Sequence, residues 1–107
     1  MKLGEIWIVH IPRLGTHEQS GTRPAVIVAQ VAKTIVTVIP CTSNAAALRF
    51  PFTHAIEPTE KNGLKDSTVA LTFHLRALDV RLLEKKIGVL DKKTFSEIRA
   101  QARKLIG

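Results

Sequence analysis

The sequence predicts a mainly β (α+β) fold: a small, strongly bent sheet or barrel of five to six short strands, with one C-terminal α-helix covering an opening. Two observations carry this prediction. Short runs rich in valine and isoleucine follow one another closely through the first 90 residues, and the apolar period changes to three and four residues after Asp91. With 107 residues, the chain is long enough for one domain, 1–107, with a single modest core.

The first three predicted strands include a hairpin. The segment Glu5–Ile11 alternates in character and stops at Pro12. The segments Pro24–Ala32 and Thr34–Cys41 are β-branched and nearly continuous in apolarity, with little more than Lys33 between them. This pattern predicts a tight hairpin of two strands that are buried on both faces.

Three further strands are expected at Phe50–Ile56, Ser67–Phe73 and Lys85–Leu90. The segment "EPTEKNGLKD" between the first two of them carries Pro58 and the pair Asn62-Gly63, which predicts a polar turn.

A helix is expected from Asp91 to the C-terminus. Its apolar face consists of residues spaced by three or four, namely Phe95, Ile98, Ala102 and Leu105. Asp91 can cap its N-terminus, and "TFSE" at 94–97 has the spacing of a capping box as a second choice.

Composition bounds the partners and the compartment. Sixteen Lys and Arg residues against nine Asp and Glu give a net charge of +7. This excess favours a polyanion, first a nucleic acid (RNA or DNA) and second an acidic protein, although it could also serve solubility alone.

No apolar run approaches the roughly 18 residues of a membrane span, no signal cleavage site is evident, and the one cysteine suits a reducing compartment. We therefore expect a cytoplasmic protein with no membrane association.

A polar motif precedes the second predicted strand. In "HEQSGTRP" (17–24), Pro24 favours an extended conformation at Arg23, whose charged fork suits a phosphate. The motif "PCTSN" (40–44) ends the next strand and supplies Thr42. Because the two strands form a hairpin, we expect Arg23 and Thr42 to be neighbours, with the loop that carries His17 above them.

The order "GEIWIV…HEQSGTRPAVIVA…VIPCTSN…GLKDSTVAL…R…D…IGVL", followed by a helix, resembles the PemK/MazF family of toxin endoribonucleases over most of the chain. The resemblance implies an SH3-like barrel that forms a homodimer. It also implies metal-independent and cofactor-free cleavage of single-stranded RNA, such as mRNA, and inhibition by an acidic antitoxin protein.

Carried over residue by residue, the resemblance assigns catalytic roles. Arg23 would stabilise the pentavalent phosphate or protonate the leaving oxygen, and Thr42 would hydrogen-bond the scissile phosphate. His17 is a candidate for proton transfer, because histidine has an ordinary pKa near neutrality. The reaction would be attack of a 2′-hydroxyl on the adjacent phosphate, which leaves a cyclic phosphate and a 5′-hydroxyl. The residues expected to bind RNA are Glu18, Gln19, Ser20, Thr22, Ser43, Asn44, His74 and Arg76.

The chain departs from the family pattern at "TFHLRALD". Aligned on Arg76 and Asp79, the family's acidic residue is replaced by Phe73 and the following glutamine by His74, while an arginine used by some members is Leu71. Either catalysis relies on Arg23, Thr42 and a histidine, or it is weak or absent. The alternative function is a catalytically weak or inactive relative that binds RNA or an antitoxin.

Structural interpretations stand beside the functional ones. Arg23 could pair with Glu18 at the surface, and Thr42 could cap the turn that follows it.

Trp7 is expected in the core or at a dimer interface, and Cys41 is expected to be a small buried apolar group. His10 and His54 are expected to be packing or solvent residues. The histidines and the cysteine show no metal-ligand spacing. A peptide-binding SH3-like domain is disfavoured, because aromatic residues make up 5% of the chain and tyrosine is absent.

Overall fold

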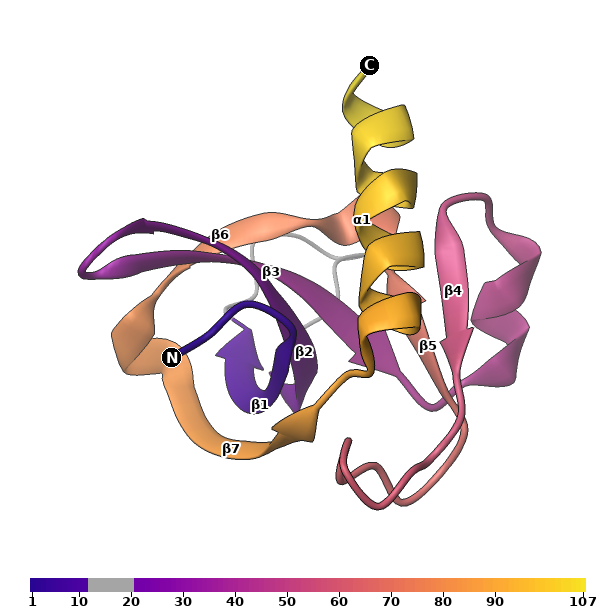
Figure 1. Ribbon diagram of the computed structural model, residues 1–107, viewed down its shortest axis with the longest axis horizontal. Coiled ribbons are helices and arrows are strands. Elements are labelled where there is room, and N and C mark those ends of the chain that lie inside the picture. Colours follow the sequence, from indigo (N-terminus) through magenta and orange to yellow (C-terminus); the bar gives the residue numbers. More distant parts are fainter. Residues whose placement is uncertain (12–20) are drawn as a thin grey trace.

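The structure is a computed structural model that describes residues 1–11 and 21–107, and in these residues an antiparallel sheet curls beside one α-helix (Figure 1). The strands are β1 (Glu5–Ile11), β2 (Gly21–Ala32), β3 (Ile35–Thr42), β4 (Thr53–Ile56), β5 (Thr68–Leu71), β6 (Arg76–Asp79) and β7 (Leu83–Val89). The helix is α1 (Lys92–Ile106), and three short 3₁₀ helices are η1 (Ala45–Arg49), η2 (Thr72–His74) and η3 (Val80–Leu82). The sheet order is β4-β5-β3-β2-β1-β7, and β6 pairs with β3. The predicted mainly β fold with a C-terminal helix is confirmed.

The hairpin of β2 and β3 is present as predicted, with Val26 opposite Ile39 and Ala25 opposite Pro40. Burial on both faces holds for the stretch Ala25–Ile27, but the end of β2 is exposed, and Val31 is 64% exposed. The reason is geometric: β1 pairs with β2 only as far as Val26, so the rest of β2 extends beyond β1, while β3 on its other side continues to pair with it.

Strand β3 joins two parts of the sheet. Its first half, Ile35–Val38, pairs with β6, and its last residues, Cys41 and Thr42, pair with β5. Strand β6 was not expected from the sequence. The strand expected at Ser67–Phe73 is shorter, because the chain turns into η2 at Thr72. The strand expected from Phe50 starts at Thr53, because Phe52 adopts a left-handed backbone conformation with φ of 57°.

Two buried clusters lie on the two faces of the central hairpin. One consists of Ile6, Val26, Ile39, Cys41, Ile56, Ala70, Leu90 and Ile98, and the other of Val9, Ile11, Ala25, Ile27, Val36, Val38 and Leu78. Trp7 is partly buried and packs against the second cluster, in agreement with the first of the two places expected for it, the core and a dimer interface.

The helix covers the first cluster through fully buried Ile98 and partly buried Phe95, as its apolar spacing predicted. Asp91 caps it by accepting a hydrogen bond from the Thr94 amide at 3.0 Å, which was the first of the two caps considered. No helix in the part of the chain described by the structure is long and apolar enough to cross a membrane.

Candidate functional site

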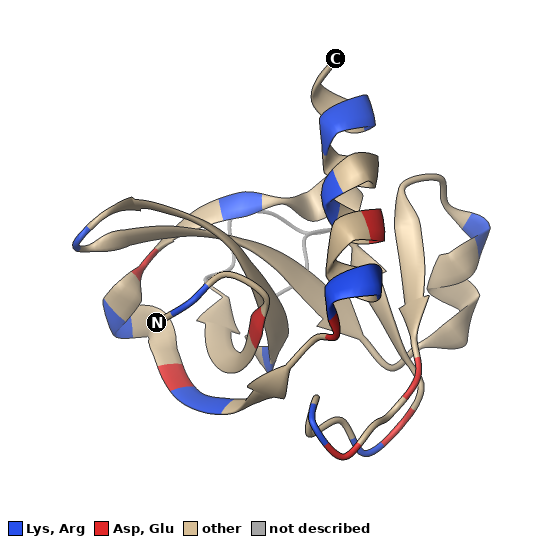
Figure 2. Cartoon of the chain, in the orientation of Figure 1, with Lys and Arg blue, Asp and Glu red and all other residues tan. Residues whose placement is uncertain are grey.

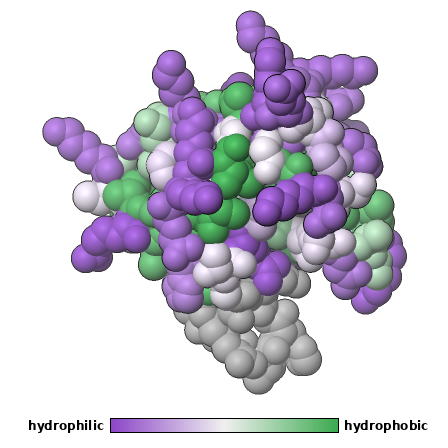
Figure 3. Space-filling model, turned by 90° about the horizontal axis from the view of Figure 1, so that it is seen from below, coloured by the Kyte–Doolittle hydropathy of each residue, from purple (hydrophilic) through white to green (hydrophobic). Residues whose placement is uncertain are grey.

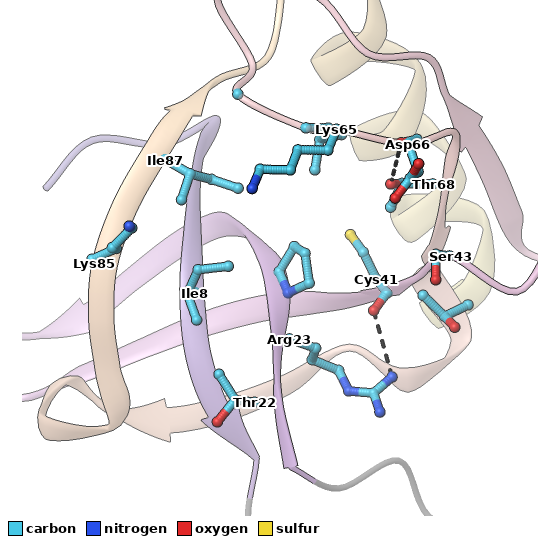
Figure 4. A pocket seen from close by; sticks show the side chains of 14 residues that line it. Ile8, Thr22, Arg23, Cys41, Ser43, Lys65, Asp66, Thr68, Lys85 and Ile87 are labelled. Atoms are coloured by element: carbon cyan, nitrogen blue, oxygen red, sulfur yellow. Dashed lines mark hydrogen bonds between the residues drawn. The ribbon is translucent and has the colours of Figure 1, made fainter.

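A pocket of about 500 Å³ opens where the start of β2 meets the end of β3 (Figure 4). Strand β7 and one residue of β1, Ile8, form a second side, and the turn 63–66 that precedes β5 forms a third. In Figure 1, β7 and this turn lie at the lower edge of the molecule. Figure 3 shows that lower side, where apolar surface is exposed between long hydrophilic side chains.

Arg23 and Thr42 meet at this pocket, as the hairpin predicted. Arg23 is half-buried on β2, where its backbone pairs with Val9 of β1, and Nη1 donates to the Cys41 carbonyl oxygen at 3.5 Å (Figure 4). The Thr42 hydroxyl oxygen accepts from the Asn44 amide at 3.2 Å. Thr42 therefore does support the following turn, but this bond uses its oxygen as an acceptor and leaves the O–H available to donate.

The pocket carries more positive than negative charge. Arg23, Lys65 and Lys85 line it, and Asp66 is the carboxylate among the lining residues. Elsewhere the Lys and Arg residues are spread over several elements, including α1, β7 and η1 (Figure 2). The excess of cations within one concave site, rather than the overall charge, suits it to a phosphate or another anion.

Cys41 presents its sulfur to the pocket but is only 1% exposed (Figure 4). Burial raises the pKa of its thiol to about 12, although the positive charge of Arg23 acts in the opposite direction. The thiol therefore stays protonated near neutral pH and is unsuited to act as a nucleophile. This agrees with the prediction that Cys41 is a small buried group.

The predicted site residues fall into three groups. Thr22, Arg23, Thr42 and Ser43 line the pocket. Three others lie outside its lining: Asn44, which caps η1 by accepting from the Ala46 amide at 3.0 Å, His74 on η2 and Arg76 on β6. His17, Glu18, Gln19 and Ser20 lie outside the described residues.

The positions that depart from the family pattern also lie away from the pocket. Leu71 is buried, and the Phe73 ring packs against His74 at 4.4 Å between ring centroids and edge-on against Phe50 at 5.7 Å. A contact between the Phe73 and His74 rings thus occupies the place where the family pattern expects an acid and a glutamine.

Sequence reasoning missed Lys65, Asp66, Thr68 and Lys85 as pocket residues. The available signal was a lysine and an aspartate directly after Asn62-Gly63, which was interpreted only as a turn. Nothing in the sequence indicated that Lys85 on β7 would lie at the same pocket. No group of three His, Cys, Asp or Glu side chains that could hold a metal ion occurs among residues 1–11 and 21–107.

The curled sheet with one covering helix defines a small β-barrel protein, with a pocket of net positive charge at a strand junction. The family model of the PemK-like, MazF-like toxin of type II toxin-antitoxin systems matches residues 2–106, and the chain belongs to this family. Endoribonuclease activity is known for the family.

Solved structures of the family resemble this chain. MazF from Deinococcus radiodurans is 26% identical with a TM-score of 0.82, over 100% of this chain and 96% of that chain. The MazE-MazF structure from the same organism gives 24% identity and a TM-score of 0.74, over 100% and 96%. An endoribonuclease in complex with its cognate antitoxin, from mycobacterial species, is 17% identical with a TM-score of 0.73, over 98% of this chain and 93% of that chain. No curated protein sequence matches the chain.

Proposed function

We propose that this protein is an endoribonuclease that cleaves single-stranded RNA at the pocket of Arg23 and Thr42. The observation that carries the proposal is the meeting of these two side chains at one concave, positively charged site. Membership of a family of toxin endoribonucleases supports it.

The proposed reaction is attack of a ribose 2′-hydroxyl on the adjacent phosphorus, with departure of the 5′-oxygen. Negative charge builds up on the phosphate oxygens in the transition state, and the Arg23 guanidinium can donate two parallel hydrogen bonds to them. The Thr42 hydroxyl donates a third. The attacking 2′-hydroxyl gives its proton to water, and the leaving oxygen takes a proton from Arg23 or from His17, which lies outside the described residues. Water then returns a proton to that donor. The products are a 2′,3′-cyclic phosphate and a 5′-hydroxyl, and no metal or cofactor takes part.

The test is incubation of the purified protein with a long single-stranded RNA in EDTA, followed by analysis of the new ends. We expect fragments with cyclic phosphate and 5′-hydroxyl ends at the same rate with and without EDTA. Intact RNA after prolonged incubation at a molar excess of protein would contradict the proposal.

The second candidate is a family member that binds RNA or an antitoxin without cleaving. The aromatic contact of Phe73 with His74 favours it, because these residues replace the acid and glutamine of the family pattern. In the same experiment this candidate predicts retarded migration of intact RNA in a gel shift.

Two partners complete the proposal. The MazE-MazF structure and the toxin-antitoxin complex among the similar structures support an antitoxin partner, and the net charge of +7 favours an acidic one. We also propose a cytoplasmic homodimer, in which a two-fold axis uses one surface patch on both subunits. Sedimentation equilibrium at tens of micromolar should give twice the mass of the 11.8 kDa chain.

A further inference from the structure

The turn between β4 and β5 is anchored far more firmly than a surface loop requires. Asn62 is only 3% exposed and makes four hydrogen bonds. Its side-chain oxygen accepts from the amides of Thr59 and Leu64, each at 3.0 Å, and its side-chain nitrogen donates to the Glu57 carbonyl at 2.9 Å. Its own amide donates to the Thr59 hydroxyl at 3.1 Å. One buried side chain thus fixes the path of the backbone from Glu57 to Leu64.

The same turn touches β7 backbone to backbone. A Cβ atom on Gly63 would lie 2.0 Å from the Ile87 carbonyl oxygen, and one on Gly88 would lie 2.4 Å from the carbonyl oxygens of Lys61 and Asn62. The Val89 amide also donates to the Lys61 carbonyl at 2.9 Å. Only residues without a side chain fit at these two positions. The turn and the strand therefore form one continuous wall.

This wall carries side chains that the proposed cleavage does not use. Leu64, Lys65 and Asp66 line the pocket, and the Lys65 side chain extends across it towards Ile87 (Figure 4). The facing surface is apolar, because it is formed by Ile8 and Pro24. The pocket thus has an anion end at Arg23 and Thr42, and a mixed remainder that combines apolar walls with two lysines and the Asp66 carboxylate.

The volume of the pocket exceeds what a phosphate needs. At about 500 Å³ it lies in the range of about 300–1,000 Å³ typical of sites for small organic molecules. Apolar side chains suit the faces of a base, while a lysine and a carboxylate can hydrogen-bond to its edge. A nucleotide matches this distribution of charge and apolar surface, with its phosphate at Arg23.

We propose that the turn 62–66 is the base-binding wall of the RNA site, and that Lys65 and Asp66 select the nucleotide next to the cleaved phosphate. The inference rests on the proposed function, since it uses Arg23 to place the phosphate. Lys65 can only donate hydrogen bonds, so it disfavours a base edge that presents donors. An ionised Asp66 can only accept them, so it disfavours a base edge that presents acceptors.

The test compares cleavage of a single-stranded RNA library with randomised positions by the parent protein and by Lys65→Met and Asp66→Asn. Sequencing of the 5′-hydroxyl ends gives the base preference on each side of the cut. We expect Asp66→Asn and Lys65→Met to change the preference at one adjacent position by about tenfold, the scale of a base-specific hydrogen-bonded pair. The matched control is Lys61→Met, because the Lys61 side chain lies on the same turn outside the pocket lining and should leave the preference unchanged. An equal loss of rate on all sequences, with the preference intact, would overturn the proposal.

A second measurement separates this inference from the cleavage mechanism. Binding of uncleavable 2′-O-methyl oligonucleotides of different sequence is followed by fluorescence anisotropy. If the parent binds with a sequence preference that Asp66→Asn alters but cleaves nothing, the proposed cleavage fails and the base-binding wall stands. If cleavage occurs while neither variant changes the preference in binding or in cleavage, the wall is refuted and the cleavage stands. A parent that neither binds these oligonucleotides nor cleaves unmodified RNA refutes both. Both substituted residues are exposed, so circular dichroism should show native folding in each variant.

Discussion

At the scale of single residues, Arg23 lies on β2 between β1 and β3, and its guanidinium donates to the Cys41 carbonyl of β3. Arg23→Ala removes a positive charge from the place where the proposed transition state gains negative charge. We expect the rate of RNA cleavage to fall by about 100- to 1,000-fold, the usual cost of losing such a donor. Arg23→Lys should recover only part of the rate, because an ammonium cannot make the two-pronged contact. Single-turnover cleavage assays measure these effects.

Two controls accompany this prediction. Arg103→Ala removes an exposed arginine from the last turn of α1 and should cleave at the parent rate. Thr42→Ser keeps the hydroxyl and should retain most activity, whereas Thr42→Ala should lose less than Arg23→Ala because it removes an uncharged donor. Parent-like cleavage by Arg23→Ala would contradict the mechanism.

Glu5 is a buried acid whose ionisation stabilises the fold. Burial of its side chain disfavours the charged form, but hydrogen bonds from the Trp7 indole at 2.9 Å and the Lys2 backbone, together with the Lys86 ammonium at 2.9 Å, outweigh this effect and lower the pKa to about 2. Because the pKa is lower in the folded state, the stabilisation is present above the ordinary pKa of about 4.3 and is lost as the pH falls towards 2.

We therefore predict that the free energy of unfolding in urea falls by roughly 2–3 kcal/mol between about pH 5 and pH 2 because of Glu5 alone. The variant Glu5→Gln should be less stable at pH 7 and should show a smaller fall over the same range. The control is Glu84→Gln, an exposed change on β7 that should follow the parent. Parallel pH profiles for the parent and Glu5→Gln would refute the assignment.

At the scale of elements, α1 is attached to the sheet by a polar bridge as well as by Ile98. The Thr72 hydroxyl, fully buried, donates to the Gln101 side-chain oxygen at 2.6 Å, and the Gln101 side-chain nitrogen donates to the Thr53 carbonyl at 2.8 Å. Gln101 thus joins the helix to η2 and to β4, two elements that are adjacent in space but remote from it in sequence.

Gln101→Ala should lower the free energy of unfolding by about 1–3 kcal/mol, because it leaves the buried Thr72 hydroxyl without its acceptor. Chemical denaturation measures the change. The matched control is Gln30→Ala on the exposed end of β2, where the side chain donates only to the nearby Ala32 carbonyl at 3.3 Å, and it should change stability by less than 0.5 kcal/mol or so. If the two substitutions lowered the free energy of unfolding equally, the Gln101 bridge would contribute no more to stability than an exposed hydrogen bond.

The elements also show what the sequence can predict. The hairpin and the juxtaposition of Arg23 with Thr42 were predictable, because two β-branched runs with a short break have one simple pairing. The Asp91 cap was predictable for a similar reason, since it depends on residues three apart. Strand β6 was not, because Arg76–Asp79 is short, begins and ends with charged residues, and is defined only by its distant partner Ile35–Val38.

The same distinction explains the site. The anion end of the pocket follows from local motifs, whereas Lys65 and Lys85 come together through a contact between a turn and β7. The sequence of the turn does not indicate that it contacts β7, and the sequence of β7 does not indicate a contact with the turn. The pattern of residues along the chain therefore does not predict such long-range contacts between backbone segments.

At the scale of the whole molecule, the net charge of +7 bears on both proposed partners. An acidic antitoxin segment and RNA are both polyanions, and the pocket with three cations is a site where they would compete. We predict that an acidic peptide from the antitoxin displaces a fluorescent oligonucleotide, with a potency that falls as salt concentration rises. Anisotropy titrations at several salt concentrations measure this, and simultaneous binding of both ligands would rule out a shared surface.

The contact of Gly63 with Ile87 and of Gly88 with the turn has a consequence for the evolution of the pocket. The spacing between the turn and β7 is set by main-chain atoms, because a Cβ atom at either glycine would overlap the opposite backbone. We expect substitutions in the second cluster, none of whose members lines the pocket, to leave this spacing unchanged. A single added methyl group at position 63 or 88 would instead force the wall open. If the pocket takes the proposed nucleotide, the spacing that limits its size is thus controlled by two positions that have no side chain.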